Sequence, residues 1–129
     1  MYAMLCTRPD ICFIVGMVSR YQSNPGLAHW VAVKHIFKFL QGTKDYVLEY
    51  RANNLMPLVY IDSDFQCDKD SKKSTSGYVF ALSGGTISWK SVKQYCIADF
   101  TIESEYVAVS RATKKAVWLN KFLIWKLCW

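Results

Sequence analysis

Residues 77–90 read GYVFALSGGTISWK and constrain the architecture more strongly than any other stretch of the chain. Two runs rich in β-branched and aromatic residues, 77–82 and 86–90, flank Ser83, Gly84 and Gly85. Such runs are typical of strands, and a short glycine-containing connection between them is typical of a hairpin. The stretch therefore predicts two antiparallel strands. Because the two glycines lack the flanking residues of a phosphate-binding loop, they are interpreted as a turn.

The residues before this hairpin predict a further strand that leads into a group of acids. Residues 57–61, PLVYI, are a strand candidate. Four aspartates follow within nine residues: Asp62, Asp64, Asp68 and Asp70. Residues 47–50, VLEY, are an additional strand candidate, and residues 52–56 are interpreted as a turn. Together with the hairpin, these segments predict an antiparallel β meander.

The residues after the hairpin predict one long helix, from about residue 101 to residue 122 or beyond, with Glu103 in its first turn. At 100° per residue, one stripe of this helix contains Ile102, Glu105, Val109, Ala112, Ala116, Leu119 and Leu123. Glu105 is therefore expected on the apolar face. A carboxylate placed there requires a cation, a hydrogen-bond donor or a metal.

The N-terminal third predicts a pair of helices. Pro9 suits the first turn of a helix that stops near residues 23–26, SNPG, and residues 27–40 have a wide apolar face. The expected fold class is thus α/β, in the sense of α+β: an N-terminal helix pair, an antiparallel β meander and one long helix.

Composition narrows the possible class of protein. The 129 residues are 52% hydrophobic and 20% charged, as in a folded domain, and no apolar run is long enough for a membrane span. Arg8, Pro9 and Asp10 stand where a signal peptide would need an unbroken apolar core, so no such peptide is expected. The compartment is therefore unknown, and intracellular by default.

Five cysteines without a C-x-x-C pair are interpreted as reduced thiols. The net charge of +6 suggests a polyanionic partner such as nucleic acid.

The acids suggest metal chemistry. Strand alternation places Asp62 and Asp64 on one face, and a facing Glu105 would complete half of a two-metal site that activates water for phosphodiester hydrolysis. Two alternatives stay open: Glu105 is paired with a Lys or Arg, and residues 62–70 form a solvated turn. A calcium-binding loop does not fit, because its sixth position is Cys67 and its twelfth is Lys73.

Five ordered motifs are similar to the ribonuclease H domain of copia-type LTR retrotransposon Pol polyproteins. They are residues 60–65 (YIDSDF), 73–80 (KSTSGYVF), 84–91 (GGTISWKS), 93–94 (KQ) and 103–108 (ESEYVA). Residues 1–11, 23–26 and 29–30 resemble the end of the preceding reverse transcriptase region. The resemblance implies two parts: residues 1–43 as the reverse transcriptase C-terminal or connection segment, and residues 44–129 as the N-terminal part of a ribonuclease H-like domain.

The resemblance also implies a chemistry. The family hydrolyses the RNA strand of an RNA–DNA hybrid with two Mg²⁺ ions, and its catalytic and metal-binding acids correspond to Asp62 and Glu105, with Asp64 supporting at most. The family's other two acids follow its first helix and have no counterpart here. Asp99, Phe100 and Ile102 depart from its usual small residues. A truncated ribonuclease H-like unit, inactive alone and weak in Mg²⁺ binding, is therefore expected.

Other functions are kept open. One is a non-catalytic binding or effector-like interaction protein recruited from a retroelement, and another is a translated remnant without function. An uncovered sheet edge would also favour a homodimer. No membrane partner is expected.

Overall fold

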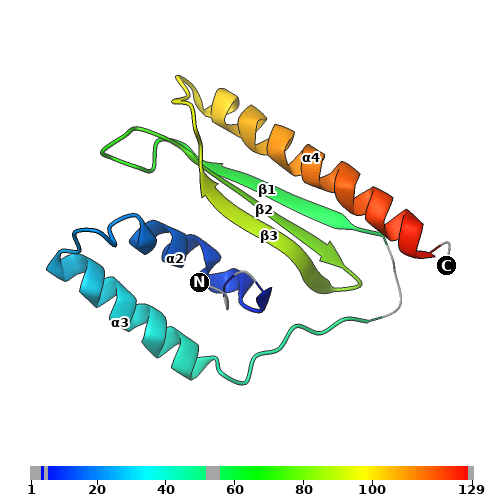
Figure 1. Cartoon of the computed structure of the whole chain (residues 1–129), viewed down its shortest axis with the longest axis horizontal. Coiled ribbons are helices and arrows are strands. Elements are labelled where there is room, and N and C mark those ends of the chain that lie inside the picture. The colour runs from blue at the N-terminus through cyan, green and yellow to red at the C-terminus, as the bar shows by residue number, and fades with distance from the viewer. Residues whose placement is uncertain (1–3, 5, 52–55, 128–129) are drawn as a thin grey trace.

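The computed structural model describes the chain except residues 1–3, 5, 52–55 and 128–129. A 3₁₀ turn, η1 (Pro9–Ile11), leads into α2 (Cys12–Ser19) and α3 (Leu27–Gly42). The strands β1 (Leu58–Asp64), β2 (Thr75–Leu82) and β3 (Gly85–Lys93) form an antiparallel sheet in chain order, and α4 (Thr101–Leu127) is the last described element (Figure 1). The expected α+β class is confirmed.

The hairpin prediction is confirmed in detail. Ser83 and Gly84 connect β2 to β3 with positive φ angles of 53° and 83°, as a two-residue type I′ turn requires. This turn matches the right-handed twist of the strands, so it fixes the β2–β3 register. The register changes once, between Phe80 and Ala81.

The expected strand at residues 47–50 is wrong. Residues 46–51 have no regular secondary structure and cross the end of the hairpin instead. The Arg51 N–H donates to the Ser83 carbonyl at 2.8 Å, and the Tyr50 hydroxyl donates to the Thr86 carbonyl at 2.8 Å. A strand requires a ladder of backbone hydrogen bonds, which these contacts do not form. The predicted turn at 52–56 lies largely outside the described residues.

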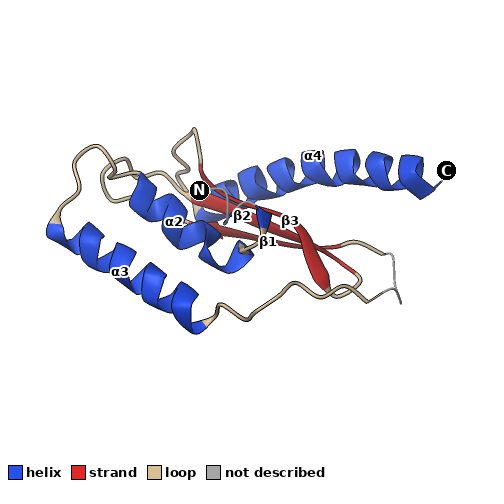
Figure 2. Ribbon diagram, turned by 60° about the horizontal axis from the view of Figure 1, so that its bottom comes forward, coloured by secondary structure: helices blue, strands red, loops and turns tan. Residues whose placement is uncertain are grey.

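The sheet lies between two helical layers (Figure 2). Its α2 face, which carries Asp62, Asp64 and Trp89, meets η1 and α2, and the Trp89 indole N–H donates to the Met4 carbonyl at 2.5 Å. Its α4 face, which carries Ser63, Ser76 and Phe80, meets α4. Each face therefore supports a different part of the chain.

Both predicted N-terminal helices are present, but none of the residues of α3 is buried. Contacts at both ends hold this helix in place. At the start, the ring of His29 stacks on Tyr21 with centroids 4.2 Å apart. At the end, the Arg8 guanidinium donates to the Thr43 hydroxyl at 2.6 Å. Between these points α2 and α3 enclose an apolar groove of about 430 Å³.

A buried amide joins the sheet to α4. Gln94 is 1% exposed, and its Nε2 donates to the Ser76 hydroxyl at 2.8 Å and to the Ser104 carbonyl at 2.9 Å. Its backbone N–H donates to the Ser74 carbonyl at 2.8 Å. The first turn of α4 is thereby fixed against β2.

The face of α4 that packs on the sheet differs from the expected stripe. Its buried residues are Ser104, Ala108, Ala112 and Leu119, whereas Glu105 is exposed and Ile102 is 81% exposed. Ala112 and Leu119 were predicted correctly. The predicted orientation of the first turns relative to the sheet is wrong. Hydrophobicity favoured Ile102 and Val109 as sheet-facing residues, whereas the structure places small residues where the helix and the sheet approach closely.

An ion-pair cluster connects the end of α2 to the sheet. The Asp68 carboxylate is buried and contacts Lys93, and one of its oxygens lies 3.6 Å from Arg20 Nη1. Arg20 Nη2 also donates to the Thr75 hydroxyl at 3.1 Å. The hydrogen bond from Lys93, with those from the N–H groups of Ser71 and Asp70, lowers the pKa of Asp68 to about 2, against the opposing effect of burial.

Across the described residues, we find no helix with the length and hydrophobicity that a membrane crossing demands. The four described cysteines, Cys6, Cys12, Cys67 and Cys96, are free thiols.

We predict that Gln94→Leu lowers the free energy of unfolding by about 2–4 kcal/mol. The substitution removes the donor to the buried Ser76 hydroxyl and the second donor to the Ser104 carbonyl, which is also an acceptor within α4, and each loss costs about 1–3 kcal/mol. Urea unfolding followed by circular dichroism measures the change. Gln41→Leu, at an exposed position of α3, is the matched control, and an equal loss in both variants would contradict the role given to Gln94.

We predict that Asp68 makes stability depend on acid pH. Its pKa is lowered in the folded chain, so its stabilising effect is complete above the unfolded-state value near 4 and is lost as the pH falls toward 2. Asp68→Asn should lower stability at pH 7 and flatten the decline between pH 5 and 2. Urea unfolding across this range measures both effects, with the exposed Asp70→Asn as control. A decline as steep in Asp68→Asn as in the unchanged chain would exclude this explanation.

Candidate functional site

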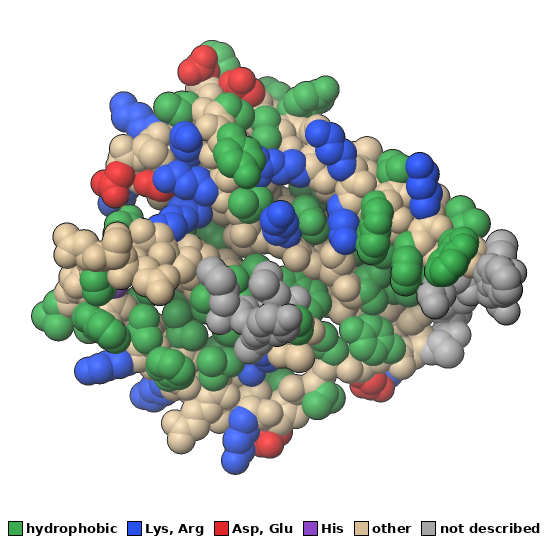
Figure 3. All heavy atoms as spheres, in the orientation of Figure 1, with side chains coloured by type: hydrophobic (Ala, Val, Ile, Leu, Met, Phe, Trp, Pro, Cys, Tyr) green, Lys and Arg blue, Asp and Glu red, His purple; other side chains and the backbone are tan. Residues whose placement is uncertain are grey.

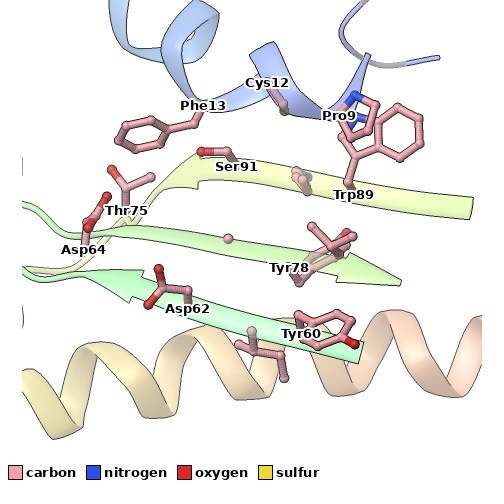
Figure 4. Close-up of a pocket in the computed structure, with 14 residues that line it drawn as sticks. Pro9, Cys12, Phe13, Tyr60, Asp62, Asp64, Thr75, Tyr78, Trp89 and Ser91 are labelled. Atoms are coloured by element: carbon pink, nitrogen blue, oxygen red, sulfur yellow. The ribbon is translucent and has the colours of Figure 1, made fainter. Parts of the chain in front are cut away.

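Asp62 and Asp64 lie side by side on the α2 face, as strand alternation predicted. They line an open cavity of about 360 Å³ between the sheet and the start of the helical layer. Cys12 and Phe13 close it from α2, and Figure 4 shows both carboxylates on the side of the sheet that faces this helix. Both acids are exposed, and Asp62 Oδ1 accepts a hydrogen bond from the Ser63 N–H at 2.8 Å.

Glu105 belongs to the other layer. It lies in the second turn of α4, which packs on the opposite face of the sheet, and its side chain is exposed. The expected arrangement, in which Asp62 and Glu105 face each other across the helix–sheet interface, is therefore wrong. The residue of β1 that points toward α4 at this level is Ser63, whose hydroxyl lies 3.4 Å from Gln94 Nε2.

The described residues do not by themselves fit a pair of Mg²⁺ ions. Magnesium prefers octahedral oxygen ligands, and two-metal sites share several carboxylates between ions about 4 Å apart. Asp62 and Asp64 are two residues apart on one strand, which separates their backbones by roughly 6–7 Å. Within the described part of the chain, no three His, Cys, Asp or Glu residues form a group that could hold a metal.

The acidic cluster of the sequence divides into two parts with different roles. Asp68 turns inward and forms the ion pairs with Arg20 and Lys93, and its Oδ1 accepts the N–H of Asp70 at 3.1 Å. Asp62 and Asp64 stay exposed on the strand. The sequence contains no local signal for the role of Asp68, because its cationic partners lie 48 residues before it and 25 residues after it.

Glu103 acts as the first-turn acid that the sequence predicted. Its Oε2 accepts the backbone N–H of Asp99 at 2.9 Å and so closes the start of α4. The Ser104 hydroxyl donates to the Thr101 carbonyl at 2.7 Å in the same turn. These bonds, with those of Gln94, fix the turn from which Glu105 projects.

Comparisons with known proteins identify close relatives. The chain is 47% identical over 123 residues to the retrovirus-related Pol polyprotein from transposon TNT 1-94 of Nicotiana tabacum, covering 95% of the chain and 9% of the relative. It is 34% identical over 118 residues to the Pol polyprotein from transposon RE2 of Arabidopsis thaliana, covering 91% of the chain and 8% of the relative. The chain thus spans less than a tenth of these polyproteins.

A third relative is short. The chain is 46% identical over 121 residues to secreted RxLR effector protein 161 of Plasmopara viticola, and the match covers 93% of the chain and 85% of that protein. No protein-family model matches the chain. No solved structure matches it either.

Proposed function

The chain belongs to the family of retrovirus-related Pol sequences from copia-like transposons, and on that basis we propose that it contains the start of a ribonuclease H-like domain. In this proposal residues 1–43 are the end of a reverse transcriptase region, and residues 44–129 begin the nuclease unit. The substrate of the complete unit is the RNA strand of an RNA–DNA hybrid. Asp62 and Glu105 are two of its catalytic acids, with Asp64 in a supporting role at most.

The observation that carries this proposal is the order in which the structure presents its elements. An antiparallel β1–β2–β3 meander is followed by α4 on one face, with Asp62 in the first strand and Glu105 near the start of the helix. This order agrees with the one that the sequence resemblance implies. The residues that fix the start of α4, Gln94 and Glu103, both lie within the resembling motifs.

We further propose that the chain alone does not catalyse hydrolysis. Asp62 and Glu105 lie in different layers, and the described residues supply no third acid between them. When bound, Mg²⁺ in such enzymes activates water and stabilises the leaving oxygen. In the complete unit Asp62 and Glu105 would be its protein ligands once further segments bring them together, whereas in this structure they lie in different layers and would not bind one ion jointly.

A complementation experiment tests the proposal. We expect the purified chain with Mg²⁺ to leave a labelled RNA–DNA hybrid intact. Joining it to the segment that follows the matched region in the tobacco relative should create hybrid cleavage. In that fusion Asp62→Asn and Glu105→Gln should each abolish cleavage, because each removes a metal ligand, whereas Asp64→Asn should retain most of it.

Asp99→Asn is the matched control, since Asp99 is an exposed acid close to the same helix end. Cleavage that persists in the Asp62→Asn fusion, or cleavage by the chain alone that Asp62→Asn abolishes, would each contradict part of the proposal. The first outcome would show that Asp62 is not a catalytic acid. The second would show that this chain supplies every residue that catalysis needs.

A second candidate function rests on the short relative. A protein named as a secreted effector shares almost its whole length with this chain, and we propose as the alternative that the chain works by binding and not by catalysis. The edge of β1 with which no described strand pairs is a surface for such binding. Leu58, Val59 and Tyr60 on this strand are 56%, 43% and 65% exposed, and an exposed apolar edge strand favours pairing with another strand.

We predict that this edge forms a homodimer. Size-exclusion chromatography with light scattering should give about twice the monomer mass of 14.9 kDa. Tyr60→Lys should shift the chain to monomer, because a lysine on an edge strand disfavours pairing. Tyr46→Lys, at another exposed tyrosine in the loop before β1, should remain dimeric. A monomer at high concentration would refute the dimer.

A further inference from the structure

The charge of α4 is strongly uneven along its length. Glu103 and Glu105 are its only acids, and both lie in the first two turns. From residue 106 to the end of the chain there is no acid, and five cations follow: Arg111, Lys114, Lys115, Lys121 and Lys126. The greater part of this helix is therefore complementary to a polyanion.

The described cations and two aromatic residues share one side of the helix. At 100° per residue they fall within an arc of about 120°, beside the buried line of Ser104, Ala108 and Ala112. We call this side the basic–aromatic flank, made of Arg111, Lys114, Lys115, Trp118, Lys121 and Phe122. Figure 3 shows Lys and Arg side chains interspersed with hydrophobic ones along α4.

The side chains of this flank are already arranged in stacks. Lys115 Nζ lies 3.9 Å from the centre of the Trp118 ring, and Trp118 stacks on Phe122 at 5.5 Å with an angle of 10° between the rings. The Arg111 guanidinium lies 5.2 Å from the ring centre of Tyr95, in the loop after β3. Trp118 is 54% exposed and Tyr95 is 86% exposed, so large aromatic surfaces face solvent.

We propose that the basic–aromatic flank binds single-stranded nucleic acid. Lysine and arginine on the flank contact the phosphates, and the bases stack on Trp118, Phe122 and Tyr95. The cation–π contacts do not prevent this, because such contacts at exposed sites are weak and their cations can exchange the ring for a phosphate. Lys115 and Arg111, which now lie over Trp118 and Tyr95, become phosphate ligands.

The aromatic residues favour a single strand over the other polyanions. In a duplex the bases are stacked on each other and their faces are inaccessible, so Trp118 and Phe122 would contribute little. An acidic protein surface would pair with the cations but would not require stacked exposed rings beside them.

This inference goes beyond the proposed nuclease function, and an experiment can reject it without rejecting that function. The flank lies on the layer opposite the cavity of Asp62 and Asp64, and it includes neither of the proposed catalytic acids. Binding therefore requires no metal and no additional segment.

The test is fluorescence anisotropy of labelled 20-mers with the full chain: oligothymidine, oligouridine and a mixed duplex. We expect both single strands to bind more tightly than the duplex, and we expect affinity to fall as salt rises because counterions are released. Equal or tighter binding of the duplex would overturn the proposal. Polyglutamate that competes as well as oligothymidine would instead identify the flank as a protein-binding surface.

Matched variants locate the site. Trp118→Ala should weaken oligothymidine binding about 5- to 160-fold, the range for loss of one stacked base. Trp30→Ala on α3, where the ring is 56% exposed, should not. The double variant Lys114→Ala with Lys115→Ala should lower the salt slope by about 1.4, at about 0.7 per phosphate contact. Lys34→Ala with Lys38→Ala removes the same charge from α3 and should leave the slope unchanged.

Trp118→Phe keeps an aromatic ring and should retain most of the affinity, which separates stacking from a structural effect of Trp118→Ala. Circular dichroism of each variant verifies that α4 is intact. Equal losses in the α3 and α4 variants would assign the binding to net charge alone and overturn the proposal.

Discussion

The buried amide of Gln94 is the interaction on which the rest of the structure depends. It binds β2 through the Ser76 hydroxyl and α4 through the Ser104 carbonyl, at a point that solvent does not reach. A hydrophobic residue could fill the same space, but it could not set the rotation and the height of the helix. The direction of Glu105 and the side of α4 on which the cations lie both depend on the position of this first turn.

The hairpin and the helices could be predicted because their signals are local. Ser83 and Gly84 supply the two positive φ angles of the turn, and alternation placed Asp62 and Asp64 on one face. The segment at residues 47–50 could not be assigned correctly, because its sequence suits a strand and only the tertiary contacts of Tyr50 and Arg51 fix its path.

The candidate site was harder to predict for the same reason. A helical wheel gives the relative angles of residues, but the phase against the sheet depends on how closely the helix approaches. Ser104 and Ala108 allow a close approach, and Glu105 consequently points outward. Likewise, the burial of Asp68 depends on Arg20 and Lys93, which only the fold brings together. Asp68, which is buried in ion pairs, and the exposed Asp62 and Asp64 thus differ in their surroundings and not in residue type.

The attachment of α3 has a consequence for the dynamics of the chain. None of its 16 residues is buried, and its end contacts include the ring stack of His29 on Tyr21 and the Arg8 guanidinium, which donates to Thr43 and lies 5.7 Å from the centre of the Phe39 ring. A helix held in this way opens through sub-global fluctuations that leave the sheet and α4 folded. Its amide protons should therefore exchange with solvent at a rate set by this local opening, while those of β2 report the global unfolding of the molecule.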